Sequence, residues 1–429
     1  MAASATHEAI EAVWRIESAK IIAVLARMLR DVGVAEELAQ DVLITALEQW
    51  PDTGVPDKPA AWLTAAAKNR ALDHLRHQTL LLRKHRELGL EMEVRQELAD
   101  VAQQEALERI DEDIDDDLLR LIFTACHAVL AFEARVALTL RLLGGLATDE
   151  IARAFLLPEP TVAQRIVRAK RSLTEARVPF EVPRAEERPA RLAAVLEVIY
   201  LVFNEGYAAT AGDDWMRPAL CDEALRLGRI LAQLMPSEPE VHGLVALMEI
   251  QASRIGARTG PGGEPILLLE QNRARWNHML IGRGLAALAR AEELDGALGP
   301  YALQAAIAAC HARAPAAQDT DWTRITALYD ALAQLNPSPV VELNRAVAVC
   351  MAYGPAAALV IVDPLLAEPK LKAYHLLPSV RGDFLAKLGR LAEAGAEFER
   401  AASMTRNVRE RELLLERALA CARGLPPGR

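Results

Sequence analysis

An all-α fold is predicted for this chain by its composition, its periodicity and the scarcity of strand patterns. Ala, Leu, Arg and Glu, which favour helices, are abundant, whereas aromatic residues make up only 4%. Apolar residues recur at spacings of three and four, and β-branched runs bounded by turn residues are almost absent. The 429 residues are too many for one small core, so we expect about two to four domains.

The cysteines and the hydropathy pattern restrict the class of protein. The five cysteines are widely scattered, and no CxxC pair or nearby histidine at ligand spacing accompanies them, apart from the neighbour His127. We therefore expect buried free thiols, no metal site and no cofactor. Neither a secretory signal nor an uncharged apolar stretch long enough to span a bilayer is visible, which predicts a cytoplasmic protein without membrane contact.

Charge is distributed unevenly along the chain. The net charge of −10 argues by itself against nucleic-acid binding, because lysine and arginine supply most of the affinity for phosphates. Residues 62–86, however, hold six lysines and arginines against one acid, and residues 153–171 hold five against one. Between them, residues 87–117 hold thirteen acids and two arginines, which predicts a solvated linker. Two basic modules therefore flank an acidic linker.

The first module, residues 1–86, opens with a predicted amphipathic helix from Ala35 to Trp50. Its apolar residues recur every three or four positions and form one stripe that faces a core. We expect the helix to end at Pro51, because proline disrupts a continuing helix. The acids that lie mostly outside the stripe are Glu36, Glu37, Asp41 and Glu48.

A second helix of this module is predicted to begin at Pro59, since proline suits the first turn of a helix. Trp62 falls among Ala and Leu, so we expect it to be buried rather than stacked on a base. One face of the helix is polar and basic, as single-stranded DNA binding requires. That face carries Lys68, Asn69, Asp73, Arg76 and His77.

The order and the amino-acid sequences of these two helices resemble conserved region 2 of sigma factors. The resemblance rests on residues 35–50, then on Pro59-Ala-Ala-Trp-Leu, Asn69-Arg70 and Asp73-His-Leu-Arg76. It implies that the first helix docks on the coiled coil of the largest polymerase subunit and that the second takes the upstream −10 promoter element. The implied polymerase contacts are Glu37, Leu38, Asp41, Val42 and Leu47, and the implied DNA contacts are Asn69, Arg70, Asp73 and Arg76.

The second module, residues 118–178, predicts a helix-turn-helix. Thr148 can cap a short helix, and two acids follow it where they complement the helix dipole. After Leu157-Pro-Glu-Pro, the pattern Thr161-x-x-Gln predicts a capping box and a helix that starts after Thr161. On that helix one side is apolar and the other is basic. The apolar side carries Val162, Ile166, Ala169 and Leu173.

The geometry of a helix-turn-helix assigns roles to the polar side of the second helix. Its early residues reach base edges in the major groove, whereas lysines and arginines further along contact phosphates. We expect Thr161, Gln164, Arg165 and Arg168 to read bases. Lys170 and Arg171 would hold the backbone.

The string from Leu118 to Leu173 resembles sigma region 4, which binds the −35 element. The small residue or glycine that is usual in the turn is replaced here by Leu156-Leu157-Pro158. Region 2, a linker at 87–117 and region 4 without an intervening region 3 resemble the extracytoplasmic-function (ECF) sigma factors of the sigma-70 family. The resemblance implies that the linker threads toward the RNA exit channel, where its acids would mimic RNA.

The C-terminal half, residues 190–429, reads as successive helices with breaks near residues 212, 236, 260, 336 and 354. Helix pairs at such intervals suggest an α-solenoid. Gly382, Gly389, Ala394, Phe398 and Ala401 have spacings that resemble a tetratricopeptide unit, in which small residues permit close helix packing. Segments such as Asn204-Glu-Gly-Tyr207 and residues 270–276 resemble the helical extension of group forty-two of the ECF sigma factors.

The sequence thus predicts a sigma factor that binds core RNA polymerase and promoter DNA, with a C-terminal domain that regulates it through an intramolecular contact or a protein partner. Inhibition and assistance by that domain are both compatible with the sequence. We do not expect an enzyme, because no metal-binding HExxH, phosphate loop or nucleophile elbow occurs. Two alternatives stay open: a helix-turn-helix regulator that never touches polymerase, and a solenoid scaffold or enzyme with a DNA-binding appendage.

Overall fold

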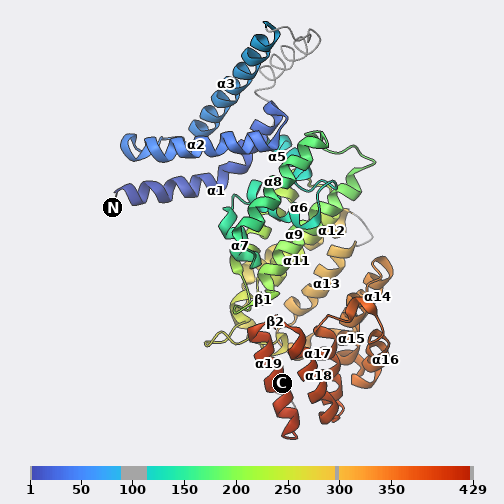
Figure 1. Cartoon of the computed structure of the whole chain (residues 1–429). Coiled ribbons are helices and arrows are strands. Elements are labelled where there is room, and N and C mark those ends of the chain that lie inside the picture. Colours follow the sequence, from blue (N-terminus) through green and yellow to red (C-terminus); the bar gives the residue numbers. More distant parts are fainter. Residues whose placement is uncertain (1, 88–113, 295–298, 426–429) are drawn as a thin grey trace. The chain divides into compact units, whose positions relative to one another are not determined.

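The structure is a computed structural model that describes residues 2–87, 114–294 and 299–425 (Figure 1). The described residues confirm the all-α prediction, since the only strands among them are two segments of two residues each. The chain divides into two compact units between Val198 and Ile199, inside helix α9 (Arg188–Tyr207). Most of the acidic linker, residues 88–113, lies outside the described residues.

The first module forms a bundle of three helices. α1 (Ala2–Leu29) lies beside α2 (Val32–Thr53), and α3 (Pro59–Glu87) packs against both (Figure 1). Asp31 caps α2 by accepting hydrogen bonds from the backbone N–H groups of Gly33 and Val34 at 2.7 and 3.0 Å. The predicted start of α3 at Pro59 is confirmed.

The prediction that Pro51 ends the first amphipathic helix is wrong. α2 continues through Pro51 to Thr53 and ends at Gly54, whose backbone lies at φ 84° and donates to the carbonyl of Trp50 at 2.9 Å. A proline in the last turn removes only one intrahelical hydrogen bond, so the helix tolerates it there. Trp50 is buried and meets the ring of Trp62 edge to face, with centroids 5.3 Å apart.

The second module consists of α5 (Ile114–Ala125), α6 (Phe132–Leu142), α7 (Thr148–Phe155) and α8 (Glu159–Glu175). α5 begins inside the acidic run that we expected to be solvated. Asp117 corrects that expectation: it is fully buried, and it accepts hydrogen bonds from Arg27 of α1 and from Arg120, each at 2.8 Å. The two arginines compensate a carboxylate that could not otherwise leave water. The two modules therefore pack together through α1 and α5.

The second unit is an array of helices, and each break that the sequence predicted falls between two of them. Met235 to Glu238 separate α10 from α11, Asn336 to Ser338 separate α14 from α15, and Gly354 separates α15 from α16. The helices are α10 (Pro218–Leu234), α11 (Pro239–Ala252), α12 (His278–Leu294), α13 (Pro300–Arg313), α14 (Trp322–Leu335), α15 (Pro339–Tyr353), α16 (Pro355–Leu365), α17 (Leu376–Lys387), α18 (Leu391–Met404) and α19 (Val408–Ala422). Short 3-10 turns lie at Ile255–Ala257, Leu268–Glu270, Arg273–Arg275, Ala317–Asp319 and Pro369–Leu371.

A short parallel ladder joins the first and last segments of the second unit. β1 (Ala211–Gly212) pairs with β2 (Arg406–Asn407). Asn407 is only 1% exposed, and its side-chain amide donates to the carbonyls of Ala209 and Asp214 at 3.1 and 2.9 Å. These contacts hold together residues that are some two hundred positions apart in the sequence.

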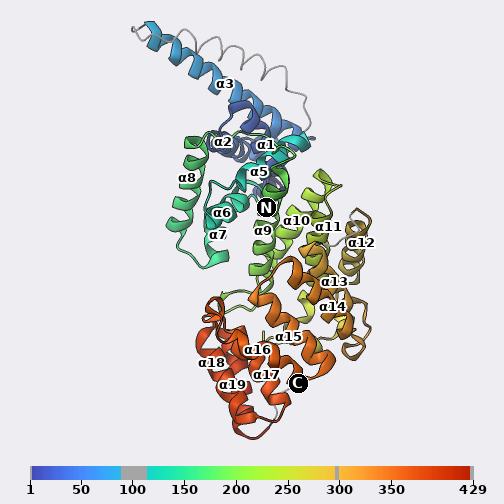
Figure 2. The same ribbon diagram turned by 90° about the vertical axis from the view of Figure 1, so that its right-hand side faces the viewer.

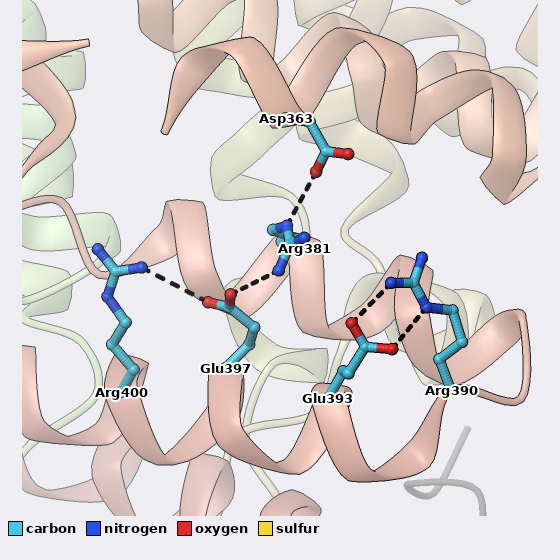
Figure 3. A network of polar contacts seen from close by, with 6 residues as sticks. All are labelled: Asp363, Arg381, Arg390, Glu393, Glu397 and Arg400. Atoms are coloured by element: carbon cyan, nitrogen blue, oxygen red, sulfur yellow. Dashed lines mark hydrogen bonds and ion pairs between the residues drawn. The ribbon is translucent and has the colours of Figure 1, made fainter. Parts of the chain in front are cut away.

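Close packing of α17 on α18 explains the small residues of the repeat-like segment. A Cβ atom at Gly382 would lie 3.0 Å from the ring of Phe398, which is fully buried. Gly389, at φ 77°, forms the turn between the two helices. Arg381 fixes the pair from outside, since it donates to Asp363 of α16 at 2.9 Å and to Glu397 of α18 at 2.7 Å (Figure 3).

Candidate nucleic-acid interface

α7 and α8 form a helix-turn-helix, and α6 packs against both helices (Figure 2). The predicted apolar side of the second helix is confirmed, because Val162, Ile166, Ala169 and Leu173 are all at most 5% exposed. Their burial orients the opposite, basic side of α8 outward. The sequence pattern was sufficient here because one helix with a period of 3.6 residues separates the two faces.

Both predicted helix caps are wrong, the first by one residue and the second by three. α7 is preceded by Ala147, whose backbone N–H donates to the Glu150 carboxylate at 2.7 Å, so that Thr148 is already helical. α8 starts at Glu159 after Pro158, and Thr161 lies in its first turn rather than at the cap. Pro160 fits the first turn of a helix, because its φ is fixed near the helical value and it lacks an N–H that would need a partner. The helix therefore begins before Thr161.

Leu156 occupies the position in the turn at which a glycine is usual. Its backbone is left-handed, with φ 50° and ψ 44°, and its N–H donates to the carbonyl of Arg153 at 3.3 Å. A side chain in this conformation costs about 1–2 kcal/mol. The turn therefore keeps the geometry of a helix-turn-helix at the expense of local strain.

We predict that Leu156→Gly raises the stability of the module by about 0.5–1 kcal/mol, because glycine removes the strain but adds unfolded-state entropy. Little packing is lost, since Leu156 is 53% exposed. Thermal unfolding checks this, with the opposite sign expected for Val167→Gly, which places glycine at a 63% exposed position inside α8. A lower melting temperature for Leu156→Gly would contradict the assignment of strain.

The predicted DNA contacts of α8 differ in their availability. Gln164 and Arg168 are exposed, whereas Thr161 and Arg165 are half-buried on the same side. Arg171 is exposed and donates to Glu175 at 2.6 Å, a surface pair that holds the guanidinium loosely. This carboxylate also raises the pKa of Arg171.

Lys170, the other predicted phosphate contact, is engaged inside the protein. Its ammonium forms an ion pair with Glu36 of α2, and Arg141 of α6 donates to the same carboxylate at 2.6 Å. Thr174 also donates to Asp31 at 3.1 Å. The expectation that Glu36 lies outside the buried stripe is wrong, because Glu36 is only 3% exposed. Tertiary contact with two cations from the second module accounts for this burial.

The polar face predicted on α3 is present. Asn69, Asp73 and Arg76 are exposed, and Arg76 donates to Asp73 at 3.1 Å one turn away. Arg70 is half-buried and reaches back to α2, where it donates to the hydroxyl of Thr45 at 2.5 Å and lies 3.8 Å from the carboxylate of Asp41. Arg70 therefore links the face predicted for DNA to the face predicted for polymerase.

The predicted polymerase contacts on α2 fall into three groups. Glu37 and Asp41 are exposed, Leu38 and Leu47 are half-buried, and Val42 is fully buried in the bundle core. Val42 thus packs beneath this surface and has no exposed area with which to contact polymerase. Ile44 was missed by the sequence reasoning: it is 52% exposed and lies one turn after Asp41. An exposed apolar side chain between acids was the available signal.

Other buried titratable groups, Asp117 and the cysteines, belong to the protein core. Burial raises the pKa of Asp117 in spite of the two arginines beside it. Burial also raises the pKa of the Cys126 thiol to about 11, so that thiol is neutral and unreactive. All five cysteines are buried and free, as predicted. Among the described residues no cluster of three metal-ligating side chains occurs, and none of their helices is long and apolar enough to cross a membrane.

Family models match three consecutive segments of the chain. Residues 15–80 match Sigma-70 region 2, and residues 120–173 match Sigma-70 region 4. Residues 191–292 match a family of unknown function, DUF6596. The first two matches contain the faces of α2, α3 and α8 described above. No solved structure matches the chain.

Two relatives show how far the likeness extends. An uncharacterized protein of Rhizobium meliloti (strain 1021) is 44% identical over 387 residues, which are 90% of this chain and 89% of that protein. A probable ECF RNA polymerase sigma factor, SigI, of Mycobacterium tuberculosis is 25% identical over 182 residues, which are 42% of this chain and 60% of SigI. The chain therefore belongs to one family with the Rhizobium protein, and it carries the region 2 and region 4 domains of sigma-70 factors, the promoter-binding initiation subunits of RNA polymerase, ahead of a DUF6596 domain.

Proposed function

We propose that this protein is an ECF sigma factor of the group forty-two type that binds core polymerase and directs promoter-specific initiation. The observation that carries the proposal is the pair of outward faces in the first unit. One is the acidic and apolar face of α2 with Glu37, Asp41 and Ile44; the other is the basic face of α8 with Arg165 and Arg168. A regulator that acts without polymerase needs only the second face.

Reconstitution tests this proposal directly. The full-length protein is mixed with purified core polymerase, and run-off transcription is measured on genomic fragments. We expect co-elution with core polymerase and new transcripts with defined start sites. DNA binding without co-elution would instead support the alternative helix-turn-helix regulator, and absence of both would remove the proposal.

The region 2 and region 4 modules must separate for Lys170 to reach DNA, because its ammonium is held by Glu36 in the arrangement described here. We propose that this closed arrangement is the resting form of the free protein. Asp117, held by Arg27 of α1, adds a second buried ionic contact between the modules. Removing one partner of a buried ion pair leaves the other charge buried and uncompensated, which is strongly unfavourable. Such contacts are therefore suitable as a latch between the modules.

We predict that Glu36→Gln weakens the latch and raises affinity for −35-type promoter DNA about threefold or more in the absence of polymerase. Glutamine retains the shape of Glu36 but loses the charge that holds Arg141 and Lys170. Fluorescence anisotropy with labelled duplex measures the effect. Glu48→Gln is the control, because Glu48 lies exposed on the same helix. If both variants raised the DNA affinity equally, the effect would come from reduced net repulsion between protein and DNA and not from the latch.

We further propose that residues from 190 onward form a regulatory, tetratricopeptide-like domain that contacts the sigma modules or a partner protein. The close packing of Gly382 on Phe398 and the array of helix pairs support the tetratricopeptide-like architecture. Comparison of the full-length protein with residues 1–198, the first compact unit, measures the contribution of this domain to transcription. Identical activity of the two forms would remove the regulatory role.

A further inference from the structure

Three arginines of the second unit gather around two aromatic rings. Arg254 follows α11, Arg258 follows the adjacent 3-10 turn, and Arg273 begins another. The guanidinium of Arg258 lies 3.6 Å from the ring centroid of Tyr207, and that of Arg254 lies 5.7 Å from the same ring. Arg254 and Arg273 also lie 5.9 and 5.0 Å from the ring of Trp276. The two rings thus collect three positive charges in one place.

The three arginines differ in how their donors are used. Arg258 donates to the carbonyl of Tyr207, and Arg273 donates to the carbonyl of His311 at 2.6 Å and to the hydroxyl of Thr320 at 3.0 Å. The side chain of Arg254 donates to no acceptor among the described residues, and its Nε is buried without a partner, as is Nε of Arg273. Within the part of the chain that the structure describes, no carboxylate pairs with any of the three; Asp319 acts on Arg273 only from a distance.

Two further polar groups of the cluster lack partners. The indole N–H of Trp276, a residue 4% exposed, has no acceptor, and Nδ1 of His311, a residue 8% exposed, has neither donor nor acceptor. Burial, and then the charges of Arg254 and Arg273, lower the pKa of His311 to about 4. The histidine is therefore neutral at physiological pH and adds no charge of its own. Buried polar groups without partners are uncommon in proteins and point to a missing ligand.

We propose that this arginine cluster is a binding site for a small oxyanion, a carboxylate or phosphate group, with Arg254 as its principal contact. A guanidinium with free donors matches the two oxygens of such a group in a planar, bidentate geometry. Arg254 and Arg273 are only partly buried, so each side chain keeps some contact with solvent. Arg254, Arg258, Arg273 and Trp276 all lie within the segment matched by DUF6596, and this proposal does not depend on the initiation function proposed above.

Titration calorimetry of the full-length protein tests the site, with inorganic phosphate and succinate as separate probes at constant ionic strength. We expect saturable one-site binding of at least one probe. Binding of phosphate alone identifies a phosphate ligand, and binding of succinate alone identifies a carboxylate ligand. The proposal would be overturned if neither probe bound saturably. It would also be overturned if the heat signal rose without saturation for every salt that is added.

Variants of Arg254 separate a ligand contact from a structural role. We expect Arg254→Gln to weaken binding tenfold or more, whereas Arg283→Gln, at an exposed arginine of α12, leaves it unchanged. Arg254→Lys keeps the charge but loses the bidentate geometry and serves where the glutamine variant does not fold. A second readout is the pKa of His311, followed by NMR, which should rise on binding because an anion offsets Arg254 and Arg273. Wild-type affinity in the folded Arg254 variants would sink the idea.

Discussion

Transcription from a cognate promoter is expected to fall about 100-fold when Arg165 and Arg168 are both replaced by alanine. Each arginine lies on the outward side of α8, whose other side is buried in the helix-turn-helix core. A good arginine contact to a base edge is worth about 1–3 kcal/mol of discrimination, so two of them account for a loss of this size. Run-off transcription with reconstituted holoenzyme measures it.

Core polymerase binding provides the internal control for this double variant. Co-elution with the core enzyme should stay as in the wild type, because the proposed docking face lies on α2. Arg283→Ala with Arg290→Ala removes the same charge from exposed positions on α12 and should leave transcription unchanged. If this remote pair reduced transcription as strongly, the effect would come from net charge and the reading of bases by α8 would be wrong.

Acidification is expected to loosen the second unit through His311. The pKa of His311 is about 4 in the folded protein, against an ordinary value near 6.5, because the ring is buried beside Arg254 and Arg273. The unfolded chain takes up a proton below about pH 6.5, whereas the folded chain does so only below about pH 4. The unfolded state therefore binds more protons in this window, and stability falls as pH falls through it, by about 3 kcal/mol in full.

Hydrogen exchange of the α13 amides measures this loss locally, which suits a chain of two units. His311→Asn removes the titrating group, so the difference in protection between wild type and variant should shrink from pH 7 to pH 4. His278→Asn is the matched control, since His278 is exposed at the start of α12. A constant difference between wild type and His311→Asn across this range would show that His311 titrates normally.

Local sequence was informative wherever a single helix decides the outcome. The apolar side of α8, the start of α3 at Pro59 and the breaks near residues 236, 336 and 354 follow from periodicity and proline chemistry alone. The helix ends were less well predicted. Pro51 within α2 and Thr161 within α8 show that a residue suited to a terminus does not have to occupy one.

The positions of the charged residues at the candidate sites could not be predicted from the sequence. Glu36 and Lys170 are both charged residues on amphipathic helices, and each was expected to face solvent or DNA. Their pairing depends on how α2 and α8 pack, which no periodicity encodes. The arginine cluster brings together Tyr207, Arg254 and Trp276 from segments separated by long stretches of chain.

By itself the sequence determined that the chain is helical, that its charge changes sign twice, and which side of α8 is apolar, because these properties depend on neighbours within a few turns. Only the tertiary structure decided which charges stay in water. Asp117 and Glu36 are buried because cations from other helices compensate them, and Arg254 is left without an acceptor because the surrounding helices bring rings and no carboxylate within pairing distance among the described residues. Such long-range compensation depends on packing between helices, and the order of residues along one helix does not specify it.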